Sequence, residues 1–184
     1  GVYEVNSFND IVDEVVQRRE KEIEKDRQDA KTEKGHLKYF STALKNKSIQ
    51  TVQELKIINE YRNLELYLTH ILVEAYDLEE NIKFENWDSF FDFLKKKKNI
   101  SDIKNTEGYR ESNELRKVTS ALKHSIKDLI EDERTNNIVE FRDEKFFDVN
   151  LLEKFYQRVR PKVLIFVKSF TDKIVKNLKE VKKL

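Results

Sequence analysis

The 184-residue sequence has no cysteine, one proline and three glycines. Without cysteine, the chain can form neither structural disulfides nor thiolate metal sites. The scarcity of glycine and proline leaves few positions for tight turns. The sequence also lacks the roughly 18 consecutive apolar residues of a transmembrane helix, and it lacks the basic and apolar regions of a signal peptide. We therefore expect a cytoplasmic protein that does not associate with a membrane.

Charged residues make up 39% of the sequence and apolar residues 38%, arranged in long amphipathic runs. Twelve phenylalanines, seven tyrosines and one tryptophan supply enough bulk for a packed core. This balance is typical of an all-α protein. We predict a helical bundle with a long charged N-terminal helix. Its domains are a helical extension at residues 1–50 and the bundle itself at 51–184.

Apolar residues recur with the helical period over most of the chain. We expect loops at residues 99–108 and, for the most part, at 131–149. The expected helices span about residues 8–34, 36–46, 51–80, 86–98, 109–131 and 150–183.

Local signals mark where some of these helices begin. Thr51 and Glu54 form a Thr-x-x-Glu capping box, which predicts a new helix at residue 51. Asn150, with Glu153 three residues later, predicts the start of the last helix. Pro161 predicts a kink or a split in that helix.

An aromatic helix is expected after Asn86 or Asp88, either of which can cap it. Four lysines at 95–98 suit its C-terminal end electrostatically. Its large rings can pack in the core or form an exposed apolar patch for a binding partner. These rings are Trp87, Phe90, Phe91 and Phe93.

The helix expected at 109–131 carries the candidate site. Arg116 and Lys123 fall about 20° apart on the flank of its apolar stripe, and His124 lies roughly opposite that stripe. Such a cationic cluster, with one group that titrates near neutral pH, suits a phosphate-bearing ligand, although an ordinary solvated helix face can look the same. The residues expected to form the stripe are Leu115, Val118, Leu122, Ile126 and Leu129.

The net charge is +1, but it is unevenly distributed. Residues 1–34 hold ten acids and seven bases, or −3, whereas residues 150–184 hold three acids and ten bases, or +7. The C-terminal surplus could meet RNA, a membrane surface or an acidic partner. Alternatively, these residues form an ordinary soluble amphipathic helix, whose lysine side chains extend around its apolar stripe towards water.

The sequence lacks the motifs of several classes of enzyme and metal site. There is no glycine-rich phosphate loop and no Gly-x-Ser-x-Gly nucleophile elbow. His36, His70 and His124 have none of the spacings of a zinc site, and the Glu-x-x-His pairs of di-iron bundles are missing. We therefore expect neither a metal nor another cofactor.

The segments around Arg116 and His124 resemble a known motif of helical domains. Leu115-Arg116 followed by Ala121-Leu122-Lys123-His124-Ser125 is similar to a helix of the HEPN family (higher-eukaryote and prokaryote nucleotide-binding domains). The resemblance covers roughly residues 55–174. Two departures stand out: seven residues separate Arg116 from His124, where the family motif has four to six, and Ser120 replaces an asparagine.

The resemblance implies metal-independent RNA cleavage of the toxin or antiviral type. His124 would then move protons, Arg116 would stabilise charge on phosphate, and Lys123, Ser120 and Ser125 would bind substrate. Because the seven-residue gap puts Arg116 and His124 about 80° apart on a helix, we expect a homodimer to complete the site. An antitoxin protein is a further expected partner. The alternative is a non-catalytic binding or dimerisation module.

Overall fold

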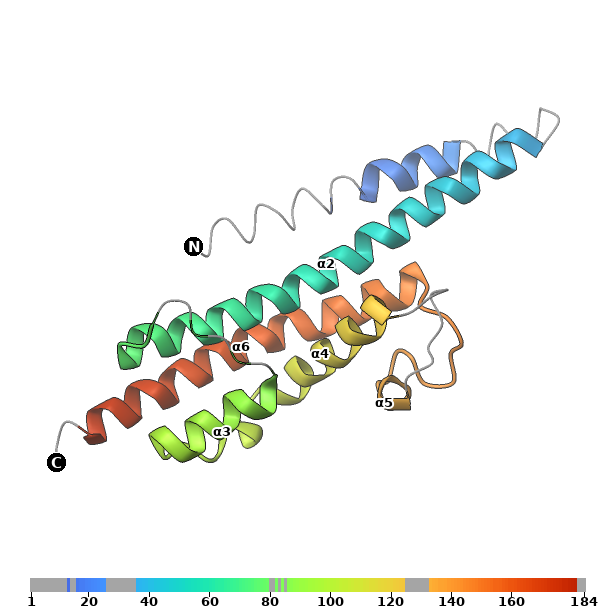
Figure 1. Ribbon diagram of the computed structural model, residues 1–184. Coiled ribbons are helices and arrows are strands. Elements are labelled where there is room, and N and C mark those ends of the chain that lie inside the picture. Colours follow the sequence, from blue (N-terminus) through green and yellow to red (C-terminus); the bar gives the residue numbers. More distant parts are fainter. Residues whose placement is uncertain are drawn as a thin grey trace. The chain divides into compact units, whose positions relative to one another are not determined.

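The computed structural model describes residues 13, 16–25, 36–79, 82, 84, 86–124 and 133–181 (Figure 1). Over these residues the protein is all-α and contains no β-strand, which confirms the predicted fold class. Residues 16–25 are helical. The labelled elements are α2 (His36–Tyr76), α3 (Trp87–Lys98), the 3₁₀ turn η1 (Ile103–Asn105), α4 (Tyr109–His124), α5 (Glu133–Asn136) and α6 (Val149–Val181).

The chain divides into two compact units, each made of two stretches of sequence. Unit 1 comprises Gly1–Asn59 and Thr119–Phe155, and unit 2 comprises Glu60–Val118 and Tyr156–Leu184. The helices α2, α4 and α6 each contribute residues to both units. The separate extension expected at residues 1–50 stays a prediction.

One continuous helix, α2, replaces the two helices expected between residues 36 and 80. The predicted capping box at Thr51 is wrong, because the Thr51 hydroxyl donates to the carbonyl of Lys47 at 2.9 Å, four residues earlier in the same helix. Ser48 donates to the Leu44 carbonyl in the same way. A threonine can bond either forward as a cap or backward within a helix. Here no glycine or proline interrupts the helix.

The last helix, α6, begins at Val149 and is capped by Asp148. The Asp148 carboxylate accepts hydrogen bonds from the backbone N–H groups of Asn150 and Leu151, at 2.7 and 3.0 Å. The predicted cap at Asn150 is therefore wrong by two positions. The predicted split is also wrong, since α6 continues through Pro161, an exposed residue, to Val181. A proline removes one helical hydrogen bond without necessarily ending the helix.

The aromatic helix α3 matches its sequence signals. The Asn86 side chain accepts a hydrogen bond from the Ser89 backbone N–H at 2.9 Å, and the Ser89 hydroxyl receives one from the Asn86 backbone, forming a reciprocal capping box. At the other end, Asn99 adopts the left-handed conformation that commonly stops a helix. The four lysines occupy the last turn of α3, as predicted.

Some predicted elements lie partly outside the described residues. Of the stretch expected at 131–149, the described residues 133–148 are mostly turns, apart from the four-residue α5. The outer parts of the helix expected at 8–34, its stop at Gly35, and residues 125–131 of the helix expected at 109–131 lie outside the described residues.

The core of unit 1 contains a small aliphatic cluster and a cluster of phenylalanine rings. Val16, Ile23 and Ile49 form the aliphatic cluster. Phe141 contacts both Phe147 and Phe155, with ring centroids 5.0 and 5.3 Å apart. The Lys56 side chain is fully buried here, where its ammonium pairs with Asp13 and lies 3.8 Å from a Glu153 carboxylate oxygen. A buried lysine requires such partners.

The core of unit 2 is built around the aromatic helix. Trp87 stacks on Phe166 at a centroid distance of 6.3 Å, and Phe90 lies 5.8 Å from Phe170. Trp87 and Phe90 are both buried, which confirms the interpretation of these two rings as core. Phe91 and Phe93 are half-buried.

Gly108, in the loop before α4, lies against the backbone of α6. Its φ of +78° lies in the left-handed region, where a side chain is strained. A Cβ atom at this position would lie 2.1 Å from the Lys162 carbonyl oxygen and 2.8 Å from the Phe166 nitrogen. Only glycine lets these two backbones approach so closely.

Candidate functional site

The helix that carries the candidate site, α4, is unbroken from Tyr109 to His124. Its predicted apolar stripe is present where the structure describes it, because Leu115 and Val118 are completely buried and Leu122 is half-buried. Ile126 and Leu129 lie outside the described residues. The stripe fixes the rotation of α4 and thereby decides which of its polar residues face outwards.

Arg116 is a half-buried side chain held by two neighbours in unit 2. Its Nε donates to the Asn113 side-chain oxygen at 3.1 Å. Its guanidinium carbon lies 5.9 Å from the centroid of the Trp87 ring, which is a cation–π contact. In the described part of the chain no carboxylate forms an ion pair with Arg116. The side chain is therefore oriented while its charge is not neutralised.

Two nearby arginines of unit 2 provide a contrast. Arg110 lies 3.2 Å from one carboxylate oxygen of Glu114, and Arg158 lies 2.8 Å from the other. Each of these two arginines therefore has a carboxylate partner, and they share the single negative charge of Glu114. The terminal nitrogens of Arg116 make no hydrogen bond to the described residues, so they can donate to an anion such as a phosphate.

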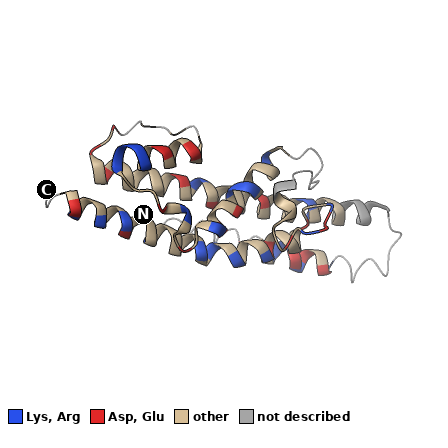
Figure 2. Ribbon diagram, turned by 90° about the horizontal axis from the view of Figure 1, so that it is seen from below, with Lys and Arg blue, Asp and Glu red and all other residues tan. Residues whose placement is uncertain are grey.

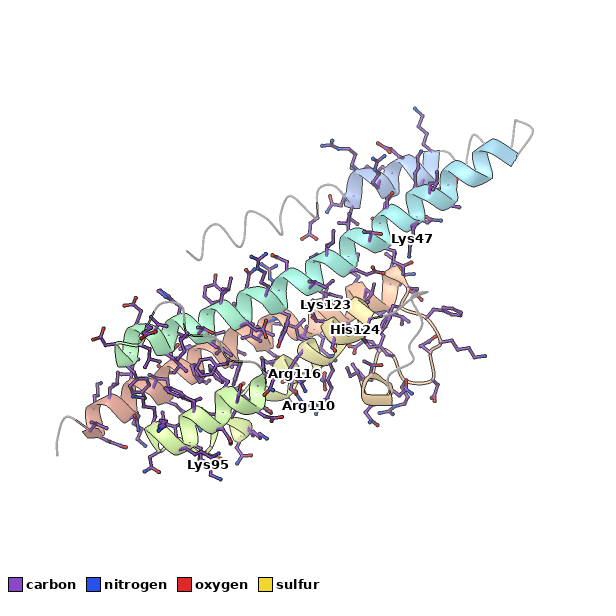
Figure 3. The ribbon with its side chains drawn as sticks, viewed as in Figure 1. Lys47, Lys95, Arg110, Arg116, Lys123 and His124 are labelled. Carbon is purple, nitrogen blue, oxygen red and sulfur yellow. The ribbon has the colours of Figure 1, made fainter. Side chains whose placement is uncertain are left out.

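Lys123 and His124 occupy the last turn of α4, and both are exposed (Figure 3). The predicted position of His124 away from the apolar stripe agrees with this exposure. Ser120 is half-buried, and Ser125 lies outside the described residues. Arg116 belongs to unit 2, whereas Lys123 and His124 belong to unit 1. Their convergence on one substrate stays a prediction.

Two tyrosines near Arg116 did not emerge from the sequence. Tyr61 donates to the Glu65 carboxylate at 2.6 Å and stacks on Trp87 at a centroid distance of 6.4 Å. Burial raises the pKa of the Tyr61 hydroxyl, the bond to Glu65 raises it further, and the Arg116 charge opposes both effects. Burial likewise raises the pKa of Tyr109, again opposed by Arg116. The spacing of Tyr61 and Glu65, four residues apart on α2, is the sequence signal that could have found this pair.

Replacing Tyr61 with phenylalanine should make the protein less sensitive to alkaline pH. Because folding raises the pKa of Tyr61, its contribution to the free energy of unfolding is fully present below about pH 10 and is lost as the pH rises further. The Tyr61→Phe variant cannot ionise at this position. Its stability, measured by urea unfolding between about pH 8 and pH 11, should therefore fall less steeply than that of the wild type.

Tyr67 provides the graded control for this experiment. Its pKa is also raised by burial, but its shift is smaller than that of Tyr61. Tyr67→Phe should therefore change the pH dependence less than Tyr61→Phe. Equal slopes for the wild type and Tyr61→Phe would contradict the environment described for Tyr61.

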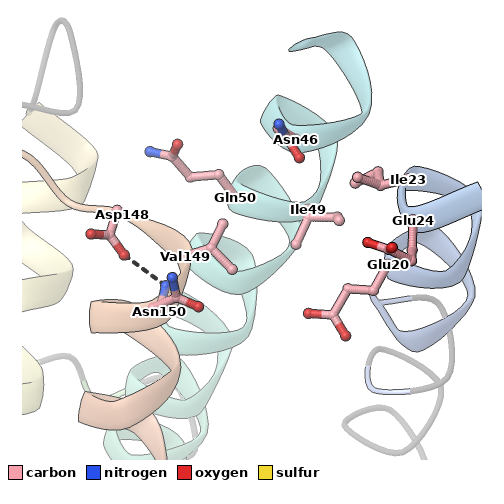
Figure 4. A pocket seen from close by; sticks show the side chains of 9 residues that line it. All are labelled: Glu20, Ile23, Glu24, Asn46, Ile49, Gln50, Asp148, Val149 and Asn150. Carbon is pink, nitrogen blue, oxygen red and sulfur yellow. Dashed lines mark hydrogen bonds between the residues drawn. The ribbon is translucent and has the colours of Figure 1, made fainter. Parts of the chain in front are cut away.

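Unit 1 contains a pocket of about 720 Å³ (Figure 4). Ile23, Ile49 and Val149 give it an apolar surface, and Glu20 and Glu24 add carboxylates. Asp148 also lines it, although this side chain caps α6. Carboxylates repel phosphate, so this pocket does not suit an RNA backbone.

The basic surplus of α6 is partly matched by acids within unit 2. The helix has eight basic and three acidic residues. Lys162 lies 3.7 Å from Glu107, and Lys173 lies 3.7 Å from Asp102. Figure 2 shows basic and acidic residues interspersed along the described helices. This pattern favours a solvated helix over a dedicated nucleic-acid surface on α6.

Membrane-spanning helices and metal-binding clusters are both absent from the described residues. None of the helices there combines the length and apolarity needed to cross a membrane. Within the same residues, histidines and carboxylates form no group of three or more that could hold a metal ion.

Comparison with protein-family models, curated proteins and solved structures gave no match to this chain.

Proposed function

We propose that this protein binds RNA through α4 and cleaves it without a metal ion. Arg116 contacts the phosphate, His124 transfers the proton, and Lys123, Ser120 and Ser125 contact the RNA backbone. The observation that supports this proposal best is the set of contacts that Arg116 makes. Asn113 and Trp87 orient it, yet it has no carboxylate partner among the described residues, unlike Arg110 and Arg158.

The chemistry requires only groups that this chain and RNA possess. The ribose 2′-hydroxyl attacks the adjacent phosphorus and the bond to the 5′-oxygen breaks, which leaves a cyclic phosphate and a free 5′-hydroxyl. His124 accepts the proton of the 2′-hydroxyl as a general base, and its protonated form can return a proton to the leaving oxygen. Arg116 stabilises the negative charge that develops on the phosphate oxygens.

A second copy of the chain is part of this proposal. Arg116 and His124 leave α4 in directions about 80° apart, so one helix does not aim both at the same phosphate. In a homodimer with two α4 helices near the symmetry axis, Arg116 of one copy can act with His124 of the other. Such an enzyme would act in the cytoplasm as a toxin or antiviral effector, with an antitoxin protein as its second partner.

Cleavage of single-stranded RNA in the presence of a chelator tests this function. The wild type should cut the RNA, and His124→Ala should abolish cutting while leaving the fold intact. Arg116→Ala should reduce the rate at least about 100-fold, because it removes charge stabilisation in the transition state. Lys123→Ala should weaken RNA binding and reduce its salt dependence, as expected for a phosphate contact.

Arg110→Ala is the matched control for Arg116→Ala. Both arginines are on α4 in unit 2, but Arg110 already pairs with Glu114. Cleavage by Arg110→Ala should therefore match that of the wild type. The ribonuclease proposal fails if the wild type cuts nothing, if His124→Ala cuts equally well, or if light scattering at micromolar concentration finds only monomers.

The second candidate function is a non-catalytic binding module. It is favoured by the same contacts of Arg116 with Asn113 and Trp87, because a purely structural arginine would also be held in this way. In that case Arg116→Ala should lower the melting temperature clearly. RNA or protein binding would then occur without any cleavage.

A further inference from the structure

Unit 2 contains a pocket of about 420 Å³ beside the Trp87 ring. Its volume lies within the usual range for small-molecule sites. Most of the lining is apolar or aromatic, including Leu66, Phe84, Trp87 and Phe90. Phe84 and Phe90 meet edge to face at a centroid distance of 5.0 Å, so they form a fixed aromatic corner. Such walls suit a flat, ring-shaped ligand.

Two charged side chains of α2 line the same pocket. Glu65 uses one lone pair to accept the Tyr61 hydroxyl, and a carboxylate has further acceptor positions on both oxygens. Arg62 is exposed and makes no ion pair with any residue that the structure describes. The pocket therefore offers an acceptor-only group and a cation beside apolar walls.

This combination discriminates among planar nitrogen heterocycles. An ionised carboxylate only accepts hydrogen bonds, so it pairs best with two adjacent N–H donors. Guanine carries two such donors side by side on its Watson–Crick edge. Adenine and cytosine present a donor beside an acceptor, and uracil presents one donor between two acceptors. An acceptor placed against a carboxylate is repelled.

We propose that this pocket binds a guanine base that carries a phosphate. Glu65 accepts from the two N–H groups of the base edge, the aromatic walls hold the ring, and Arg62 attracts the phosphate. The ligand can be a free guanine nucleotide or an unstacked guanine within RNA, since both present the same groups. The proposal goes beyond RNA cleavage and does not require it.

The pocket and Arg116 have Trp87 as a common neighbour. Trp87 lines the pocket, and the Arg116 guanidinium lies 5.9 Å from the centroid of the same ring. A guanine held here and a phosphate held at Arg116 would therefore share one supporting side chain. If the bound guanine belongs to RNA, the pocket would give the protein a preference for sequence.

Trp87, the only tryptophan of the chain, makes the proposal directly measurable. Titration of the full-length protein with GMP should change the Trp87 fluorescence, and AMP should bind at least about tenfold more weakly. Glu65→Gln should weaken GMP binding at least about tenfold, because an amide replaces one acceptor by a donor. Glu74→Gln, at an exposed glutamate of α2 outside the pocket, should bind GMP as the wild type does.

Two further binding measurements test the role of the phosphate and identify the source of the guanine base. Arg62→Ala should weaken the binding of GMP more than that of guanosine, which has no phosphate. Short RNAs with and without guanine identify the natural source: tighter binding of the guanine-containing RNA than of GMP indicates RNA, and the reverse indicates the free nucleotide. Equilibrium dialysis with labelled GMP should give the same affinities as fluorescence.

The guanine proposal is overturned if dialysis detects no GMP binding, if AMP binds as tightly as GMP, or if Glu65→Gln leaves the affinity for GMP unchanged. Far-UV circular dichroism of each variant confirms that its helices are intact. Because GMP binding needs no cleavage, failure of the ribonuclease assay leaves this result unaffected, and the two proposals can fail separately.

Discussion

Replacing Gly108 with alanine is expected to lower the free energy of unfolding by about 3 kcal/mol or more. The new Cβ would lie 2.1 Å from the Lys162 carbonyl oxygen and 2.8 Å from the Phe166 nitrogen. Both are backbone atoms of α6, so no side-chain rotation can relieve the clash. The positive φ of Gly108 adds a separate conformational cost.

Urea unfolding of the wild type and Gly108→Ala measures this difference. Ser101→Ala is a suitable control, because Ser101 is an exposed residue of the same connection between α3 and α4. Its stability should stay within about 0.5 kcal/mol of the wild type. A loss of less than about 1 kcal/mol in Gly108→Ala would mean that the loop can move away from α6 at little cost.

Replacing Lys56 with alanine is the second change with a large expected effect, a loss of about 3 kcal/mol. The Lys56 side chain is completely buried in unit 1, where it pairs with Asp13 and lies near Glu153. Truncation removes the packed aliphatic stem and leaves two carboxylates close to a cavity. Both carboxylates keep some exposure to water, which limits the electrostatic part of the cost.

Lys56→Met separates packing from charge. Methionine fills most of the volume of the lysine stem but carries no charge, so this variant should recover part of the stability lost in Lys56→Ala. Lys47→Ala, at an exposed lysine of the same helix, should change the free energy of unfolding by no more than about 0.5 kcal/mol. If Lys56→Ala behaves like Lys47→Ala in thermal and urea unfolding, Lys56 is not the buried residue described here.

The features that the sequence predicted correctly are those set by short-range physics. The start of α3 follows from Asn86 and Ser89, which are three residues apart and cap each other. The buried positions of Leu115 and Val118 follow from the helical period of α4. In each case the information needed lies within one or two helical turns.

The helix boundaries that were predicted wrongly depend on a choice between two local hydrogen bonds. The Thr51 hydroxyl can cap a helix or bond back to the carbonyl of Lys47, and the sequence pattern is the same in both cases. Asp148 and Asn150 are both good capping residues by type, and the structure shows Asp148 as the one that accepts from the first backbone N–H groups of α6.

The surroundings of Arg116 were predictable only in part. Its position on the flank of the apolar stripe follows from periodicity. Its contact with Trp87 joins α4 to α3, and the sharing of Glu114 between Arg110 and Arg158 joins α4 to α6. Such contacts depend on how helices distant in sequence pack, which no local pattern encodes.

The burial of the single tryptophan in unit 2 has a thermodynamic consequence. Trp87 emission reports the unfolding of its own unit, whereas helical circular dichroism averages over α2, α4 and α6, which contribute to both units. Coincidence of the two transitions is the test for all-or-none unfolding. The chain therefore contains, without any added label, the means to decide whether its two compact units are one cooperative system or two.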